Sequence, residues 1–320
     1  MSEQTKKVLY LGPSEFRDAI QNVLGSGFEV IRVEASAEDV NGVIGEASVL
    51  FDASMKVRFT SKLLQTAKSL ELVITATTGA DHIDTAHLES RGIPIKTLKS
   101  EKEFLRGITP AAELSWTLLL ACARRLRSAI HHVESGEWSR ELFPGMMLRG
   151  RTLGIIGMGR IGGWMTRYAR AFDMKVIGFD PFVSDFPEDV EKVELDELLS
   201  HADFVSIHVH FSEETKGLLG SRELDLMKEG AVLINTSRGA IVEESALLEG
   251  LKKGRPAALG VDVVEGEPDI KDSPIWQYSL DHHNVIITPH IGGFSPDALG
   301  MVLEHTARRI LNHYTESHGV

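Results

Sequence analysis

The sequence predicts an α/β protein of two doubly wound parallel-sheet domains with a cleft between them. Short apolar runs alternate with helical patterns over the first 100 residues, and the same alternation starts again at residue 152. This alternation is typical of parallel sheets with helices on both faces. The length of 320 residues is sufficient for two separate hydrophobic cores.

In the first part of the chain, apolar runs predict strands at 7–11, 47–51 and 70–76. A helical pattern covers 14–24, and Ser14 is the residue type that favours an N-cap position. A second helix is expected over 61–68.

The texture changes at Thr109, where an apolar-periodic pattern predicts one long helix over 109–130. Pro110 suits the first turn of this helix. After a polar loop, apolar runs predict strands at 152–157, 175–180, 203–209, 231–235, 258–263 and 284–288. An amphipathic pattern over 295–314 predicts a C-terminal helix.

Composition limits the partners and the compartment. The net charge of −12 argues against nucleic acid as the main partner, because such binding needs a concentrated basic surface. Cys122 is the single cysteine, so no intrachain disulfide can form, and no signal peptide precedes Lys6. The apolar run around Cys122 is too short to span a bilayer. We therefore expect a cytoplasmic protein without a membrane partner.

A phosphate-binding turn is predicted at Gly157, Gly159 and Gly162, which form the pattern G-x-G-x-x-G. The pattern follows an apolar strand and opens a helix, and the next strand ends in Asp180, 18 residues after Gly162. Together these features form a βαβ dinucleotide fingerprint. Gly157 permits the tight turn, Gly159 lets backbone N–H groups approach a pyrophosphate, and Gly162 lets the helix pack closely. The alternative is a glycine-rich turn that holds no ligand.

Asp180 also indicates which dinucleotide is bound. Its carboxylate can accept hydrogen bonds from the hydroxyls of the adenosine ribose and would repel a 2′-phosphate. The next residues, Pro181 and Phe182, supply no basic group to pair with such a phosphate. We therefore expect NAD rather than NADP as the cofactor.

Three polar side chains lie in loops that follow apolar runs in the C-terminal half. Arg238 lies in NTSRG (235–239), Glu267 in VDVVEGEP (261–268) and His290 in TPHIGG (288–293). The planar guanidinium can grip the carboxylate and ketone oxygen of a 2-oxo acid. The imidazole can protonate the carbonyl oxygen as hydride arrives, and Glu267 can orient that imidazole. Taken singly, each residue could equally be a surface or turn residue.

These motifs, with TTGADHID at 77–84 and GMGRIG, resemble the D-isomer-specific 2-hydroxyacid dehydrogenase family over nearly the whole chain. That family includes phosphoglycerate dehydrogenase, formate dehydrogenase and glyoxylate/hydroxypyruvate reductase. The resemblance implies a Rossmann NAD-binding domain over 101–290. It also implies a flavodoxin-like substrate domain over 1–100 plus 291–320, and a homodimer.

The resemblance further implies roles for residues at the motif positions. Substrate-binding positions are Thr78, Gly79 and Ala80, together with Arg238, and Asp262 resembles the family aspartate beside the nicotinamide carboxamide. The cofactor-binding positions are Gly157, Gly159, Arg160, Ile161, Gly162, Asp180, Thr215, Thr236, Asp262 and Gly292. No set of Cys, His and carboxylate side chains has metal-site spacing, so we expect no metal.

The chain departs from the family pattern at one substrate position. Phosphoglycerate dehydrogenases usually have an arginine and a serine where this chain has Asp52 and Ala53. An acid at this position would oppose a phosphate-bearing substrate. Lys102 or Arg106 could bind a distal anionic group instead, or they could be solvated loop charges.

The leading hypothesis is an NAD-dependent oxidoreductase that acts on a small 2-hydroxy or 2-oxo acid. One alternative is a nucleotide-sensing binding protein of the co-repressor kind, and another is phosphoglycerate dehydrogenase proper. Formate dehydrogenase is disfavoured, because its histidine is typically paired with glutamine and not with a carboxylate such as Glu267. The sequence does not name the acid.

Overall fold

The computed structural model describes residues 5–316 and divides the chain into two compact units. Unit 1 comprises the residues up to Ile108 and those from Ser295 onward, and unit 2 is Thr109–Phe294. The division after Ile108 lies later than the expected one at residue 100. The reason is packing, since Leu105 and Ile108 are buried against Ala298 in the C-terminal helix.

Unit 1 contains a five-stranded parallel sheet in the order β2-β1-β3-β4-β5. This is the doubly wound order of flavodoxin-like folds, in which the strand order reverses between the first and third strands. The strands are β1 (Lys6–Leu11), β2 (Phe28–Arg32), β3 (Val49–Asp52), β4 (Leu72–Thr75) and β5 (Ile95–Lys96). The expected strands at 7–11, 47–51 and 70–76 correspond to β1, β3 and β4.

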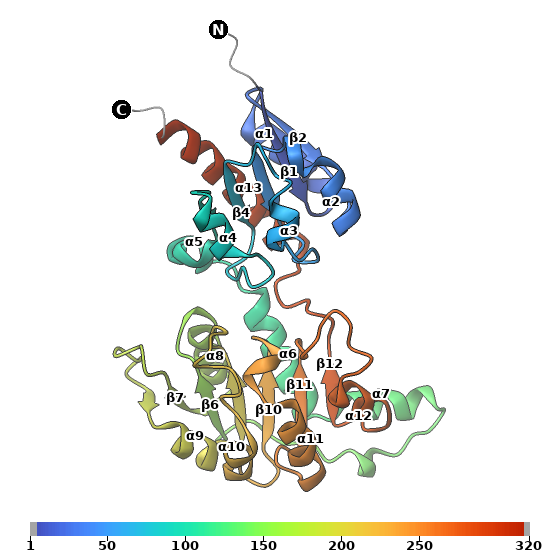
Figure 1. Cartoon of the computed structure of the whole chain (residues 1–320). Helices are drawn as coiled ribbons and strands as arrows, with labels where there is room; N and C mark the ends of the chain where they lie inside the picture. The colour runs from blue at the N-terminus through green and yellow to red at the C-terminus, as the bar shows by residue number, and fades with distance from the viewer. Residues whose placement is uncertain (1–4, 317–320) are drawn as a thin grey trace. The chain divides into compact units, whose positions relative to one another are not determined.

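The helices of unit 1 include the C-terminal helix of the chain, which lies beside α1 (Figure 1). Its residues Leu303, Ala307 and Ile310 share a core with Val8 and Phe51 of the sheet. The helices are α1 (Arg17–Leu24), α2 (Ala37–Val43), α3 (Ser61–Leu64), α4 (Thr85–Ser90), α5 (Lys102–Leu105) and α13 (Pro296–Glu316).

Ser14 is not the N-cap that its residue type suggested. It begins a 3-10 turn, η1 (Ser14–Phe16), which is closed by a bond from the Phe16 amide to the Pro13 carbonyl. The α-helix therefore starts only at Arg17, after Phe16, and no side chain caps it.

Unit 2 contains a seven-stranded parallel sheet in the order β12-β11-β10-β9-β6-β7-β8 (Figure 1). The strand order reverses between β6 and β9, as in a Rossmann fold. The strands are β6 (Thr152–Ile156), β7 (Lys175–Phe179), β8 (Val190–Lys192), β9 (Phe204–Ile207), β10 (Val232–Asn235), β11 (Ala258–Val261) and β12 (Val285–Ile287). The six strands expected in this region are confirmed, and β8 adds an edge strand.

The expectation of a single long helix over 109–130 is wrong. The helix is interrupted at Arg125, which adopts a left-handed φ of 50°. The residues before the break are largely buried, whereas the helix after it contains no buried residue. The helices of unit 2 are α6 (Pro110–Ala123), α7 (Leu126–Glu134), α8 (Arg160–Ala171), α9 (Leu195–His201), α10 (Ser221–Leu226), α11 (Glu244–Lys253) and α12 (Pro274–Asp281). Of the helices in residues 5–316, none is both long and apolar enough to cross a membrane.

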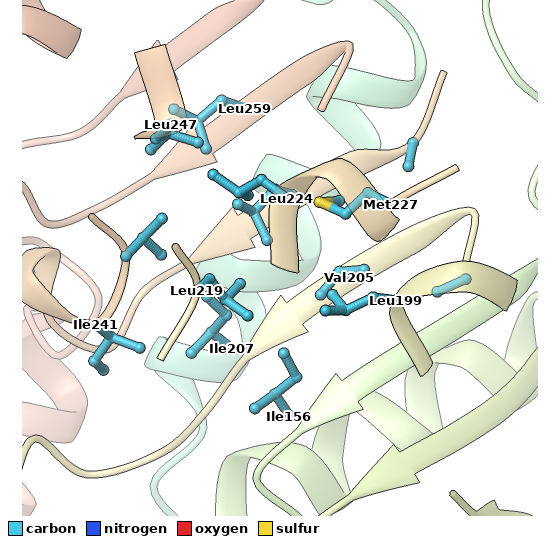
Figure 2. Close-up of a cluster of buried hydrophobic side chains, with 14 of the residues drawn as sticks. Ile156, Leu199, Val205, Ile207, Leu219, Leu224, Met227, Ile241, Leu247 and Leu259 are labelled. Carbon is cyan, nitrogen blue, oxygen red and sulfur yellow. The ribbon is translucent and has the colours of Figure 1, made fainter. Parts of the chain in front are cut away.

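Alternate side chains of the seven-stranded sheet enter two different cores, as the pleat requires. Ile156, Val205 and Leu233 pack against α9, α10 and α11, and Figure 2 shows this cluster. Their neighbours Ile155 and Phe204 pack against α6 and α8 on the opposite face. Both faces are covered, so the carboxyl edge of the sheet is left to carry polar loops.

Candidate active site

The glycine-rich turn between β6 and α8 has the geometry that the sequence predicted. Gly157 has a φ of +96°, and a Cβ atom there would lie 2.4 Å from the carbonyl oxygen of His208. A Cβ atom at Gly162 would lie 2.2 Å from the carbonyl oxygen of Gly157. At Gly159, in contrast, a Cβ atom would meet no atom within 4 Å. The turn is therefore closed on the protein side and open at Gly159.

The residue behind this turn is uncharged at neutral pH. His208 is partly buried, and burial lowers the pKa of its imidazole to about 3. One ring nitrogen, Nε2, lies 2.8 Å from the Ser206 hydroxyl. The turn thus lies at the point where the strand order reverses between β6 and β9, which is where dinucleotide folds bind their ligand.

Asp180 is held by the backbone of the same turn. Its Oδ2 accepts a hydrogen bond from the Met158 amide at 2.9 Å, and its Oδ1 accepts from Phe182 at 2.9 Å and Val183 at 3.2 Å. The carboxylate therefore links the glycine-rich turn to the end of β7. A carboxylate has about four acceptor sites, so one is left for a ribose hydroxyl.

The loops that carry Arg238, Glu267 and His290 follow β10, β11 and β12, which are neighbouring parallel strands. The carboxyl ends of parallel strands lie at one edge of the sheet, so the three loops are neighbours. The first two loops meet at Gly239, where a Cβ atom would lie 2.3 Å from the Val264 carbonyl carbon and 2.4 Å from the Glu265 amide nitrogen. Any side chain at Gly239 would push the first two loops apart.

His290 and Glu267 form a hydrogen-bonded pair, with His290 Nδ1 2.8 Å from Glu267 Oε1. The side chains are 38% and 30% exposed. His290 has a φ of 53°, a left-handed conformation that is costly for a residue with a Cβ atom. Because Glu267 takes Nδ1, Nε2 is the ring nitrogen left to a ligand.

Asp262 holds the loop that carries His290. Its buried carboxylate accepts hydrogen bonds from the Thr288 hydroxyl at 2.5 Å, the Ile291 amide at 2.9 Å and the Gly292 amide at 2.7 Å. Its carbonyl oxygen accepts from the His290 amide at 3.0 Å. These bonds stabilise the left-handed conformation of His290, so Asp262 positions the loop whatever its contact with nicotinamide.

Arg238 extends from a loop that is fixed on both sides. The Asn235 side chain donates to the Arg238 carbonyl at 2.9 Å, and the Arg238 guanidinium donates to the Ser237 carbonyl at 2.8 Å. The Thr236 hydroxyl lies 2.7 Å from the Ser115 hydroxyl on α6. The loop is therefore anchored both to its own strand, β10, and to helix α6.

The other predicted cofactor residues lie on two elements of unit 2. Arg160 and Ile161 are the first residues of α8, and the N-terminal end of a helix dipole favours an anion. Thr215 lies in the loop after β9, and its hydroxyl donates to the His210 carbonyl at 2.7 Å and accepts from the Ser212 amide at 2.8 Å. In the described structure, Thr215 thus closes its own loop.

In unit 1, the predicted substrate segment follows β4. Within residues 5–316, the backbone N–H groups of Thr78, Gly79 and Ala80 donate no hydrogen bond. The carbonyl of Gly79 accepts from the Thr77 hydroxyl at 2.7 Å, and that of Ala80 accepts from the Ile83 amide at 2.9 Å. Consecutive unpaired amides of this kind can bind an anion such as a carboxylate.

The expectation for Asp52 is wrong. Its side chain is fully buried, and its carboxylate accepts hydrogen bonds from Ser54, Met55 and His82. It therefore cannot act as an exposed acid that repels a phosphate. The signal available in the sequence was an aspartate at a strand end with a serine two residues later, which is typical of a turn closed by the aspartate side chain.

Two further predictions concern charges and metals. Arg106 forms an exposed ion pair with Glu103 at 3.0 Å, as solvated loop charges do. Within the described part of the chain, no group of three or more His, Cys, Asp and Glu side chains could hold a metal ion.

Comparison with protein families gives two matches. Residues 116–292 match the NAD binding domain of D-isomer specific 2-hydroxyacid dehydrogenases, and residues 9–99 match the catalytic domain of the same family. The two matches correspond to unit 2 and to the sheet of unit 1.

Individual relatives differ in how much of their length the chain covers. It is 34% identical over 304 residues to D-3-phosphoglycerate dehydrogenase of Archaeoglobus fulgidus. This alignment covers 93% of this chain but 56% of that protein. It is 34% identical over 270 residues to hydroxypyruvate reductase of Thermotoga maritima, with 84% of this chain and 86% of that protein covered. The chain thus spans about half of the first relative and most of the second.

A solved structure shares the fold. D-lactate dehydrogenase of Aquifex aeolicus, complexed with NAD and lactic acid, superposes with a TM-score of 0.83 at 28% identity. The match covers 97% of this chain and 96% of that one.

Proposed function

Because the chain belongs to the D-isomer-specific 2-hydroxyacid dehydrogenase family, we propose that it transfers a hydride between NAD and C2 of a small 2-hydroxy or 2-oxo acid. The observation that carries this proposal is the His290–Glu267 pair, with His290 in a left-handed conformation. Backbone strain of this kind concentrates at functional sites.

In the direction of reduction, His290 protonates the carbonyl oxygen through Nε2, and in oxidation it removes the hydroxyl proton. Glu267 binds Nδ1, fixes the tautomer and stabilises the imidazolium. Arg238 grips the carboxylate and the ketone oxygen with its planar guanidinium. The cofactor, when bound, would supply the hydride as NADH in reduction and accept it as NAD+ in oxidation.

Unit 2 holds the cofactor in this proposal. The open face of the turn at Gly159 and the first turn of α8 receive the pyrophosphate, and Asp180 receives the ribose. The residues that we assign to cofactor binding are Gly157, Gly159, Arg160, Ile161, Gly162, Asp180, Thr215, Thr236, Asp262 and Gly292.

Unit 1 is the substrate-binding unit in this proposal, and the amides of Thr78, Gly79 and Ala80 bind the substrate carboxylate. The support is that these amides donate no hydrogen bond within the described residues, although the carbonyls of Gly79 and Ala80 accept one each. A family relative, the lactate dehydrogenase from Aquifex aeolicus, was solved with a small 2-hydroxy acid.

The test is an NADH-oxidation screen of the purified protein. The panel comprises glyoxylate, hydroxypyruvate, pyruvate, 2-oxoglutarate, phenylpyruvate and 3-phosphohydroxypyruvate. We expect turnover with at least one unphosphorylated acid, and the His290→Ala variant serves as the control for contaminating reductases. A protein that binds NADH but turns over no 2-oxo acid would instead be a nucleotide-sensing binding protein.

Phosphoglycerate dehydrogenase proper is the second candidate function. Relatives of that name match 93% and 95% of this chain, and the buried Asp52 no longer argues against a phosphate. A kcat/KM for 3-phosphohydroxypyruvate well above that for hydroxypyruvate would favour this candidate.

We also propose a homodimer in the cytoplasm. Leu126, Ile130 and Val133 form an exposed apolar face on α7, and Trp138 beyond this helix is 88% exposed. A second copy would cover this surface, and Ile130→Glu should convert the dimer to a monomer in light scattering. The single cysteine, Cys122, is buried, which suits a reducing compartment.

A further inference from the structure

Two loops of unit 1 follow neighbouring strands. The 52–57 loop follows β3 and the 76–84 loop follows β4, and Asp52 pairs in register with Thr75. Both loops lie at the carboxyl edge of the sheet, beside the point where the strand order reverses between β1 and β3. Ligands of doubly wound sheets bind at this edge.

Asp52 organises the first loop from within. Its Oδ1 accepts from the Ser54 amide at 3.0 Å and the Ser54 hydroxyl at 2.8 Å, and its Oδ2 accepts from the Met55 amide at 3.3 Å. Met55 has a φ of 56°, which is left-handed and unfavourable for a methionine. The carboxylate therefore holds a strained turn.

The same carboxylate reaches the second loop through His82. His82 Nε2 lies 2.7 Å from Asp52 Oδ2, and the two side chains are 10% and 0% exposed. The backbone of His82 is also fixed, because its carbonyl accepts a hydrogen bond from the Phe59 amide at 2.8 Å. His82 is two residues beyond Ala80, so the pair anchors the segment that presents the unpaired amides.

We infer that the Asp52–His82 pair is a positioning device that holds the amides of Thr78, Gly79 and Ala80 in the arrangement that binds the substrate carboxylate. This inference rests on the proposed function and adds a determinant of substrate affinity to it. Small displacements of binding groups cost large factors in rate or affinity, so a tie between the two loops acts on the KM of the 2-oxo acid.

A general stabilising role would give a different result. If the pair only stabilised unit 1, its loss would lower the melting temperature and the amount of active enzyme. The KM of the 2-oxo acid would then be unchanged. A positioning role raises that KM and leaves the KM for NADH as it was, because the cofactor residues lie in unit 2.

The experiment compares His82→Leu with His82→Gln and with a matched control, His305→Leu. Gln keeps an N–H donor for Asp52, whereas Leu does not. His305 forms a similar pair with Glu101 at 2.9 Å in the same unit, and within the described residues no hydrogen bond joins either side chain to the two loops. The measurements are kcat and KM for the best 2-oxo acid and for NADH, with thermal melting of each variant.

We expect His82→Leu to raise the KM of the 2-oxo acid about tenfold, the factor that corresponds to one lost hydrogen bond to a charged group. The kcat should stay close to that of the wild type, His82→Gln should restore most of the affinity, and His305→Leu should resemble the wild type. If His82→Leu does not fold, Asp52→Asn replaces it, and a wild-type KM of the 2-oxo acid in Asp52→Asn would overturn the inference. An equal rise in this KM with His305→Leu would also overturn it.

The failure of this inference differs from the failure of the proposed function. A wild-type protein that reduces no 2-oxo acid contradicts the proposed function itself. An active wild type in which His82→Leu leaves the KM of the 2-oxo acid unchanged contradicts only the role of the pair.

Discussion

Each unit contains a histidine bound to a carboxylate in the loops at the carboxyl edge of its sheet, and these two pairs have nearly the same length but opposite surroundings. In unit 2, Glu267 takes Nδ1 of a partly exposed His290 at 2.8 Å. In unit 1, Asp52 takes Nε2 of a nearly buried His82 at 2.7 Å, and among the described residues the buried Nδ1 that remains has no partner. One pair leaves a ring nitrogen to a ligand, and the other does not.

The difference shows that distance alone does not identify an acid–base pair. Glu267 accepts a hydrogen bond from His290, whereas Asp52 also accepts bonds from the backbone of its own loop. The backbone strain also lies in different places. It lies on the histidine itself in unit 2 and on Met55, beside the carboxylate, in unit 1. Exposure and the location of strain therefore separate the pair that we propose to react from the pair that we propose to position a loop.

The largest expected effect is on turnover. His290→Ala should lower kcat by about 10²–10⁴-fold, the usual loss when a positioned acid is removed. NADH binding, measured by fluorescence titration, should survive. His282→Ala is the control, because His282 stacks on Tyr278 at the surface of the same unit. Near-full activity of His290→Ala would remove the distinction between the two pairs.

The second effect is on stability, and here the pair of unit 1 should matter more than the pair of unit 2. Asp52→Ala should lower the free energy of unfolding by about 3–5 kcal/mol, because it leaves buried donors without an acceptor. Glu267→Ala should cost less than about 1 kcal/mol, because that pair is partly exposed. Urea unfolding of both variants measures the difference, and equal losses would show that burial does not separate the two pairs energetically.

A third experiment examines the cation on the neighbouring loop. Arg238→Lys keeps the charge but loses the two-pronged grip on carboxylate and ketone. The loss of one charge-assisted hydrogen bond corresponds to about 10–100-fold in kcat/KM. Arg255→Lys is the matched control, because Arg255 follows the end of α11 and its guanidinium donates to the Asp225 carbonyl. Wild-type kcat/KM in Arg238→Lys would show that charge alone is sufficient at this position.

The smallest expected effect concerns cofactor preference and the carboxylate of Asp180. Two like charges at about 4 Å repel by roughly 4 kcal/mol at an effective dielectric of about 20, and a third of that is about tenfold in affinity. The wild type should therefore prefer NADH over NADPH, and Asp180→Ala should narrow the gap. Steady-state kcat/KM with both cofactors measures it, and an unchanged ratio would show that Asp180 serves only the turn at Met158.

The fold was predictable where the apolar pattern was strong. The buried strands β6, β9 and β10 have continuous apolar runs, which both faces of a parallel sheet require. The pattern missed β2, β5 and β8, which lie at sheet edges, where burial and therefore the apolar pattern are weaker. The pattern also predicted one continuous helix across Arg125, because a left-handed residue that is not glycine leaves no sequence signal.

The residues of the candidate site were likewise predictable only in part. Arg238, Glu267 and His290 could be proposed from the sequence because their residue types, in loops that follow predicted strands, suit one chemistry. The supporting bonds of Asp262 and the Asp52–His82 pair could not be, since they join residues that are distant in sequence. Asp52 was misread because a sequence gives a carboxylate its charge but not its burial.

The unbonded amides at Thr78, Gly79 and Ala80 make this segment visible to hydrogen–deuterium exchange. Amide hydrogens without an acceptor exchange readily, whereas those bonded within a structure wait for local opening. The amides of Ile291 and Gly292, which are bound to the buried Asp262, form an internal reference for slow exchange in the other unit. A ligand carboxylate that engages the 78–80 segment would therefore slow its labelling selectively, and mass spectrometry could follow occupancy without any turnover.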